Sequence, residues 1–189
     1  MIKETSKNTF VYNSMLGVLV CCLVICFFSV AVKSMATPAY LIYTITTPSG
    51  NAVNYTYLVA GENVQAVIDA GNSYVDNTYP LVNRIRSATG KYNCHSYAWY
   101  STSSSNNIWI TSSLSYTSDQ YYTLIAYGTQ AVIPTNAPVG SKVVYPSDGH
   151  SAKKYSSTKL ISKWGDWGLC IHTPGYCPYT YSTLLGYYN

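Results

Sequence analysis

The chain has 189 residues, of which 10% are charged, and its formal net charge is +4. Residues 37–189 carry eight Lys or Arg and six Asp or Glu, a balance too weak to indicate a nucleic-acid-binding protein. Their length predicts one domain with a core of its own. The 21 tyrosines of the chain favour β-rich structure with a tyrosine-heavy surface.

The first 36 residues have the layout of an export signal. Lys3 and Lys7 lie in a polar leader, residues 15–32 form an apolar run, and a small-residue site ends at Ala36. This order predicts a signal peptide that is cleaved after Ala36. A run of this length can also cross a bilayer, so an uncleaved N-terminal membrane anchor is the alternative. Both interpretations predict a secreted or cell-envelope protein.

Residues 37–88 predict a hairpin followed by short helices. Residues 40–46 and 52–60 are rich in strand-forming side chains, and a Pro-Ser-Gly turn separates them. The apolar spacing then predicts a helix near residues 63–70, which ends before Pro80. A second short helix is expected over residues 81–88.

A helix that carries a cysteine is expected next. Asn93 can cap it, and Cys94 then lies in its first turn. A polar loop over residues 101–107 and an aromatic-rich segment follow. Strands are predicted over residues 142–145, 150–155 and 159–164, so the predicted class is α+β.

Cys94 is the residue that most suggests chemistry. Three cysteines follow the N-terminal segment, and an odd cysteine in an exported protein points to a reactive thiol. A helix N-terminus favours the thiolate, which is the nucleophilic form. Cys170 and Cys177 enclose six residues with a Pro-Gly bend, which predicts a disulfide between them. The alternative is that Cys94 pairs with one of these two.

A cysteine nucleophile needs a base and a group that orients the base. Of the three histidines, His150 is the preferred base because it follows a tight turn at the start of a strand. His95 is adjacent to Cys94 and is expected to support the site, and His172 is placed in a constrained loop. Candidates for the orienting group are Ser162, Lys163, Asp148 or a backbone carbonyl. Asn93 or the N–H of Cys94 could stabilise an oxyanion.

Other chemistries have little support in the sequence. The cysteines and histidines lack zinc-site spacing, so no metal site is expected. No P-loop, GxGxxG or HExxH motif occurs, and no cofactor is predicted. Glu62 is the only glutamate after the N-terminal segment, so no catalytic carboxylate pair is indicated.

Several short motifs resemble a known family. They are Asn-Cys-His-Ser-Tyr-Ala-Trp (residues 93–99), Gly-Ser-Lys-Val-Val-Tyr (140–145), Gly-His-Ser-Ala (149–152), Ser-Lys-Trp-Gly (162–165), His172 and Cys-Pro-Tyr (177–179). This order is similar to NlpC/P60- and CHAP-like papain-fold proteins of bacteria. It is closest to an uncharacterised Gram-positive group of exported proteins that share the first motif.

The resemblance implies a papain-like fold, in which a Cys-bearing helix packs on an antiparallel sheet behind an N-terminal hairpin. It implies Cys94 as nucleophile, His150 as base and a third residue near Ser162 or Lys163. The family usually has His, Asn, Gln or Glu at that third position. The implied organisation is a signal or anchor (1–36), an extension (37–88) and a catalytic-type domain (89–189).

Three functions follow as hypotheses. The first is a secreted cysteine hydrolase that cleaves amide bonds in peptidoglycan peptides, with peptidoglycan or a peptide as its substrate. The second is a non-catalytic cell-envelope binding protein on the same fold, and the third is a cysteine acyltransferase. No nucleic-acid partner is expected, and a membrane only through residues 15–32 if they are retained.

Overall fold

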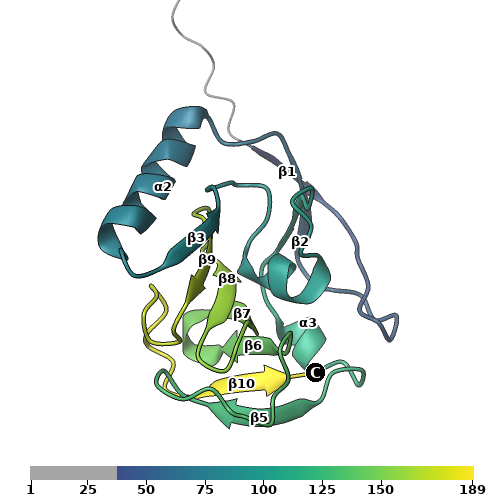
Figure 1. Ribbon diagram of the computed structural model, residues 1–189. Helices are drawn as coiled ribbons and strands as arrows, with labels where there is room; N and C mark the ends of the chain where they lie inside the picture. Colours follow the sequence, from purple (N-terminus) through teal and green to yellow (C-terminus); the bar gives the residue numbers. More distant parts are fainter. Residues whose placement is uncertain (1–37) are drawn as a thin grey trace, which may run out of the picture. The chain divides into compact units, whose positions relative to one another are not determined.

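Two antiparallel β-sheets frame the domain in the computed structural model, which describes residues 38–189 (Figure 1). The smaller sheet has the order β1–β2–β4, and the larger has the order β3–β9–β8–β7–β6–β10–β5. The first contains β1 (Ala39–Ile42), β2 (Thr56–Ala60) and β4 (Ile108–Ile110). The second contains β3 (Asn83–Arg86), β5 (Leu124–Gly128), β6 (Lys142–Tyr145), β7 (His150–Lys154), β8 (Leu160–Lys163), β9 (Leu169–His172) and β10 (Leu185–Tyr188). Helices are few, and the α+β class is confirmed.

The predicted N-terminal hairpin is confirmed, with shorter strands. β1 pairs with β2 in the register Ala39↔Ala60 to Ile42↔Tyr57, and a separate bridge joins Thr46 to Ala52. The three strands predicted over residues 142–164 also form, as β6, β7 and β8. Turns before β6 and β7 and the apolar run Val143–Val144 indicated this region in the sequence.

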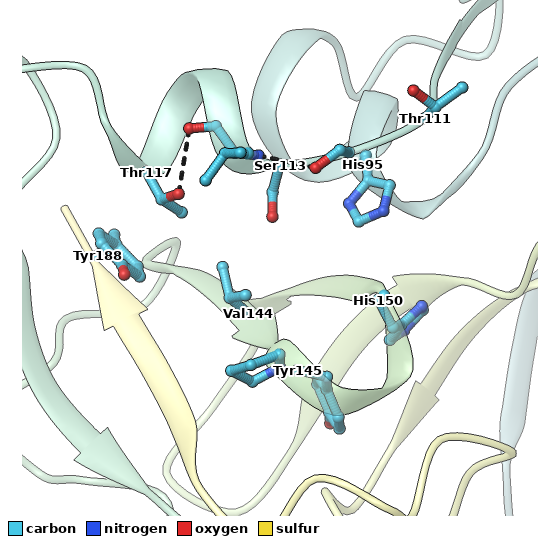
Figure 2. A pocket seen from close by; sticks show the side chains of 12 residues that line it. His95, Thr111, Ser113, Thr117, Val144, Tyr145, His150 and Tyr188 are labelled. Atoms are coloured by element: carbon cyan, nitrogen blue, oxygen red, sulfur yellow. Dashed lines mark hydrogen bonds between the residues drawn. The ribbon is translucent and has the colours of Figure 1, made fainter. Parts of the chain in front are cut away.

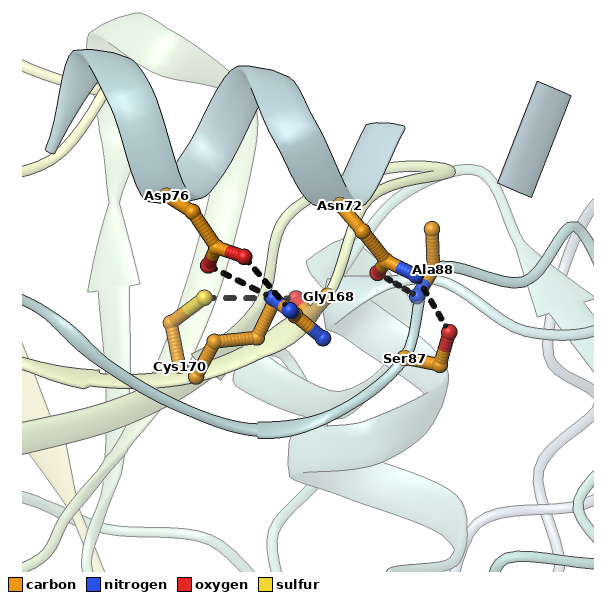
Figure 3. Close-up of polar contacts among 7 residues, drawn as sticks. Asn72, Asp76, Ser87, Ala88, Gly168 and Cys170 are labelled. Atoms are coloured by element: carbon orange, nitrogen blue, oxygen red, sulfur yellow. Dashed lines mark hydrogen bonds and ion pairs between the residues drawn. The ribbon is translucent and has the colours of Figure 1, made fainter. Parts of the chain in front are cut away.

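The segment between the hairpin and the cysteine differs from its prediction. α2 (Gln65–Thr78) is longer than the helix expected over residues 63–70. The second helix expected over residues 81–88 is wrong, because β3 occupies this segment and pairs with β9. Arg84 of β3 makes two hydrogen bonds to Asp76 of α2, of 2.9 and 2.7 Å (Figure 3). Pairing with the distant strand β9 thus determines the secondary structure of residues 83–86, whose local sequence pattern was ambiguous.

β3 also bears on the predicted division of the chain. β3 belongs to the proposed extension (37–88), but it is an edge strand of the larger sheet. The other strands of that sheet belong to the proposed catalytic-type domain. The described residues 38–189 belong to one compact unit, which contains both the proposed extension and the proposed catalytic-type domain. The predicted signal or anchor lies outside the described residues. Within residues 38–189, no helix has the length and apolar character needed to cross a bilayer.

The large sheet has two covered faces, and strand alternation sorts its side chains between them. One face packs into a core cluster that includes Val143, Tyr145 and Trp164. The other face carries Ile161 and Leu169 and is covered by the segment around the cysteine. Over the central strands β7, β8 and β9 both faces are covered, since most residues of these strands are buried.

The cysteine-bearing segment is helical, as predicted, but its last part is a π-helix and not an α-helix. The helix begins at Cys94 and continues as the π-helix η1 (Ser96–Tyr100), in which the N–H of Ser101 bonds to the carbonyl of Ser96 at 2.9 Å. Asn93 caps it as expected, since its Oδ1 accepts the N–H of Ser96 at 3.1 Å. η1 contacts β6, β7 and β8. The cysteine helix therefore packs on the antiparallel sheet.

A buried aspartate fastens the turn of the hairpin. Asp119, just after α3 (Leu114–Thr117), accepts hydrogen bonds from the side chains of Thr47, Ser49 and Asn51 and from the N–H of Tyr121. Burial opposes the charge, but these hydrogen bonds outweigh it and lower the pKa of Asp119 to about 2. The carboxylate form therefore holds the turn in place.

We expect Asp119→Asn to lower the melting temperature near neutral pH, because the amide cannot accept all four hydrogen bonds. The folded-state pKa lies below the unfolded value of about 3.9, so the stabilisation is present above that pH and is lost as the pH falls towards about 2. Thermal unfolding from pH about 6 to about 2 measures this, with the exposed Asp69→Asn as control. A difference between wild type and Asp119→Asn that stays constant over this range would contradict the role of the carboxylate.

Candidate functional site

Cys94 and the start of β7 lie together, although 55 residues of sequence separate them. The backbone N–H groups of Ser151 and His95 point to the sulfur of Cys94, and Lys163 lies close enough for its charge to act on it. Ser151 follows His150 directly. The structure thus brings Cys94 next to the backbone of β7 beside its predicted base.

Burial controls the ionisation of this thiol. Cys94 is only 6% exposed, and burial raises its pKa to about 11 despite the N–H groups and Lys163, which lower it. The expectation of a thiolate from the helix N-terminus is therefore wrong for this state of the protein. Desolvation of the charged sulfur exceeds the stabilisation from the first helical turn.

His150 has no exposed surface and no hydrogen-bond partner among the described residues at either ring nitrogen. Its ring stacks on Tyr179, with centroids 3.5 Å apart and planes 9° apart, and meets Tyr145 edge-on at 5.2 Å. Burial lowers its pKa well below the usual histidine value, and His95 and His172 lower it further. The imidazole is therefore neutral, and neither of its nitrogens has a partner among the described side chains and backbone groups.

No hydrogen bond joins Cys94 to His150 in this conformation. Strand alternation explains this, because His150 and Ser151 are consecutive in β7 and their side chains leave on opposite faces. Ser151 takes the face towards the helix, where its Oγ contacts Trp99 Nε1 and His95 Nδ1, both at 2.9 Å. His150 takes the face covered by Tyr145 and Tyr179.

His95 supports this arrangement, as its position next to the cysteine suggested. The Gly149 carbonyl faces its ring, so the ring N–H is directed there, and Nδ1 accepts a hydrogen bond from Ser151. Burial lowers the pKa of His95 to about 4, in spite of that carbonyl. Nδ1 of His95 thus holds the side chain of Ser151, whose backbone N–H faces the sulfur of Cys94.

Ser162 forms a matching chain on the other face of the sheet. Trp164 Nε1 donates to Ser162 Oγ at 3.0 Å, and Ser162 contacts His172 Nε2 at 2.9 Å. His172 Nδ1 donates to the Thr173 carbonyl at 2.8 Å, so Nε2 accepts from Ser162. Burial lowers the pKa of His172 to about 4. The partner of Ser162 is therefore His172, and the structure shows no bond from Ser162 to His150.

His172 lies in β9, so its predicted place in a constrained loop is wrong. It pairs across the sheet with Leu160. The loop prediction assumed that a disulfide closed residues 170–177, and β9 takes up the first part of that segment instead.

The predicted disulfide is wrong as well: Cys170 and Cys177 are free and buried. Cys170 is fixed in β9 opposite Ser162, and its Sγ lies 3.6 Å from the Gly168 carbonyl (Figure 3). Cys177 Sγ lies 3.2 Å from the Pro174 carbonyl. The short sequence spacing favoured closure only for a free loop, and strand pairing removes that freedom.

Lys163 is a buried cation that links the segment before the cysteine helix to the sheet. Its Nζ donates to the carbonyls of Thr89 at 2.9 Å and Gly165 at 2.5 Å, and it lies 5.4 Å from the centre of the Tyr92 ring. Burial lowers its pKa to about 8, although nearby acidic groups and Cys94 act in the opposite direction. Lys163 therefore supplies positive charge near the sulfur without contacting His150.

Asn93 is occupied by structural contacts. Its Oδ1 caps the helix, and its Nδ2 donates to the carbonyl of Ile110 in β4 at 2.6 Å. This amide joins the cysteine helix to the smaller sheet. The N–H groups of Ser151 and His95 are better placed than Asn93 to receive negative charge near Cys94.

A pocket of about 380 Å³ adjoins this region, and Figure 2 shows His95 on one side of it and Tyr145 and His150 on the other. None of its lining residues is Asp, Glu, Lys or Arg. The lining residues are His95, Thr111, Ser112, Ser113, Leu114, Thr117, Val144, Tyr145, Pro146, Gly149, His150 and Tyr188. Hydroxyl groups on apolar walls suit a neutral ligand that carries amide or hydroxyl groups.

Some site residues were not predicted from the sequence. Tyr179 lies in the Cys-Pro-Tyr motif, yet nothing in its spacing indicated that it stacks on His150. Trp164 follows β8 directly and is two residues after Ser162, a spacing that puts both on one face and could have indicated their contact.

Comparisons add no relatives to this picture, since no family model, no curated protein and no solved structure matches the chain. Among the described residues, no three His, Cys, Asp or Glu side chains are placed to hold a metal ion.

We expect Ser162→Ala to destabilise the protein by about 1–3 kcal/mol, because it leaves the Trp164 N–H and His172 Nε2 buried without partners. Urea unfolding measures this, with the exposed Ser157→Ala as the matched control. If both variants were equally stable, the chain from Trp164 to His172 would not contribute to folding.

Proposed function

We propose that the chain is a secreted cysteine hydrolase that cleaves amide bonds in peptidoglycan peptides, with Cys94 as nucleophile and His150 as base. The proposed architecture is papain-like, of the NlpC/P60 or CHAP type. Its support is a cysteine at the start of a helix that packs on an antiparallel sheet, and a histidine that opens a strand of that sheet.

The observation that carries the proposal is the unpaired imidazole of His150. Buried polar atoms in proteins nearly always have partners, and leaving one unsatisfied costs about 1–3 kcal/mol. His172, which is buried nearby, uses both of its nitrogens, and His95 uses Nδ1. His150 uses neither, although it is one residue from the N–H that faces Cys94. A residue kept free at this cost fits a base that acquires its partners during the reaction.

The reaction follows from these groups. His150 takes the proton of Cys94, and the thiolate forms a bond to the carbonyl carbon of the substrate amide. The N–H groups of His95 and Ser151 receive the negative charge that develops. The C–N bond then breaks as His150 gives its proton to the leaving amine. Water attacks the thioester, which releases the acid and restores the thiol.

The closed conformation must open for this reaction. Tyr179 covers the ring of His150, and Cys94 is buried, so substrate entry requires displacement of Tyr179. Gly149, before His150, has φ +58, a left-handed conformation that glycine adopts without strain. Removal of Tyr179 from the stack and rotation about this glycine would turn His150 towards the sulfur.

A non-catalytic cell-envelope binding protein is the second candidate. The raised pKa of Cys94 and the missing bond to His150 favour it, because they describe an inert thiol. The two candidates differ in whether the thiol becomes reactive and whether peptide bonds are broken. Analysis of the products then separates a hydrolase, which releases a free acid, from an acyltransferase, which joins the acyl group to another amine.

We expect the full-length protein to release new amino and carboxyl groups from purified peptidoglycan, and Cys94→Ala to abolish this. His150→Ala should lower kcat/KM by about 10²–10⁴-fold, the usual contribution of a general base. His172→Ala is the matched control, since it removes a buried histidine that is fully hydrogen-bonded, and it should retain activity in proportion to its folded fraction. Product formation that is unchanged in Cys94→Ala, or absent in the wild type with every peptidoglycan tried, would reject the hydrolase.

We expect Tyr179→Ala to speed alkylation of Cys94, because loss of the ring rehydrates the site and lowers the pKa of the thiol from about 11. Each unit by which the pKa falls gives about ten times more thiolate at neutral pH. Peptide mapping identifies the labelled cysteine, and the exposed Tyr181→Ala is the control. Equal labelling rates for the two variants would show that Tyr179 does not close the site.

A further inference from the structure

The smaller sheet presents a row of aromatic side chains on its outer face. Ile42, Tyr57 and Trp109 are directly opposite one another on neighbouring strands, and Tyr40 is two residues before Ile42 on the same face. Tyr40 meets Tyr57 at 6.3 Å and Trp109 at 6.1 Å, both edge-on. We call these four residues, Tyr40, Ile42, Tyr57 and Trp109, the aromatic strip.

The strip is surface and not a second core. Tyr40 is 47% exposed, Ile42 is 89% exposed, and Tyr57 and Trp109 are half-buried. The opposite face of the sheet supplies the core contacts, through Leu58, Ile108 and Ile110. Large apolar side chains gathered on one exposed face point to a binding function. The edge-on contacts hold the rings in place, so little conformational freedom is lost when a ligand stacks on them.

The surroundings of the strip are uncharged. Residues 38–61 and 92–118, which include β1, β2 and β4, contain no Asp, Glu, Lys or Arg. Burial raises the pKa of the Tyr40 phenol, and the negative charge of the exposed Asp166 acts in the same direction. A strip on strands without basic residues does not suit an anionic partner.

We propose that the aromatic strip binds an uncharged polysaccharide. Sugar rings present apolar C–H faces that stack on aromatic rings, and their hydroxyl groups match the phenol groups of Tyr40 and Tyr57. An anionic membrane would recruit Lys or Arg, and the strip has none. Pairing with a second copy through β1 is limited by an edge strand of only four residues.

This inference goes beyond the proposed function and does not depend on it. The strip contains neither Cys94 nor His150. It would hold the protein on a glycan surface whether or not the cysteine site is active, so the binding test can use Cys94→Ala.

The experiment is co-sedimentation of the full-length protein with insoluble chitin, an uncharged polymer of N-acetylglucosamine. We expect saturable binding that is about tenfold weaker in Tyr57→Ala and in Trp109→Ala, the loss typical of a central aromatic contact. Tyr181→Ala is the matched control, because Tyr181 is 83% exposed and lies outside the strip. Cys94→Ala should bind as the wild type does.

A second measurement covers the case in which an alanine variant fails to fold. A soluble N-acetylglucosamine oligomer should change the tryptophan fluorescence of the wild type, and Trp109→Phe, which keeps a ring, should still bind chitin but lose most of that change. Equal binding by the strip variants and by Tyr181→Ala would overturn the proposal. So would binding only to lipid vesicles, or a dimer that dissociates in Ile42→Lys without any binding to chitin.

Discussion

The pairing of β7 between β6 and β8 is the constraint on which the candidate site depends. It fixes Tyr145 opposite His150 and Val144 opposite Ser151. Because side chains alternate along a strand, two neighbours in sequence are sent to different layers of the domain. Ser151 joins the layer of the cysteine helix, and His150 joins the layer of Tyr145 and Tyr179. The sulfur of Cys94 therefore faces the backbone N–H of Ser151, the residue after His150, and the side chains of Cys94 and His150 do not touch.

The sheet carries two chains of the same kind, one on each face. Trp99, Ser151 and His95 form the first, and Trp164, Ser162 and His172 form the second. In each, a tryptophan N–H fills one acceptor position of a serine, which leaves the serine hydroxyl to serve a neutral histidine. These contacts give each of the two buried imidazoles a hydrogen-bond partner for one ring nitrogen. The contrast with His150, which lies near both, is what marks that residue as different.

Burial dominates the electrostatics of the region. The pKa of Cys94 is raised, and those of His95, His150, His172 and Lys163 are lowered, and desolvation is the largest cause for each of them. The described state is thus one in which the cysteine and the three histidines are uncharged. A thiolate–imidazolium pair would need water, a substrate or a rearranged Tyr179 to compensate for the loss of solvation. Reactivity in this protein is then a property of an opened state.

The sequence by itself determined the local elements and the start of the cysteine helix. Turn residues and strand-forming runs predicted the hairpin and the strands β6 to β8, and Asn93 predicted the start of the cysteine helix. These signals are short-range, because turns, caps and strand alternation depend on neighbouring residues. The odd number of cysteines and the turn before His150 singled out Cys94 and His150, and the fold brings Cys94 to the end of β7 that begins with His150.

Only the tertiary structure decided the rest. It made β3 a strand by pairing it with β9, and it left Cys170 and Cys177 free by fixing the first of them in that strand. It assigned Ser162 to His172 and set Tyr179 on His150, contacts between residues 10 and 29 positions apart in the sequence. It also divided the tyrosines between the core, as at Tyr145 and Tyr187, and the aromatic strip. Composition predicted their number but not their places, because burial is set by partners that are distant in the chain.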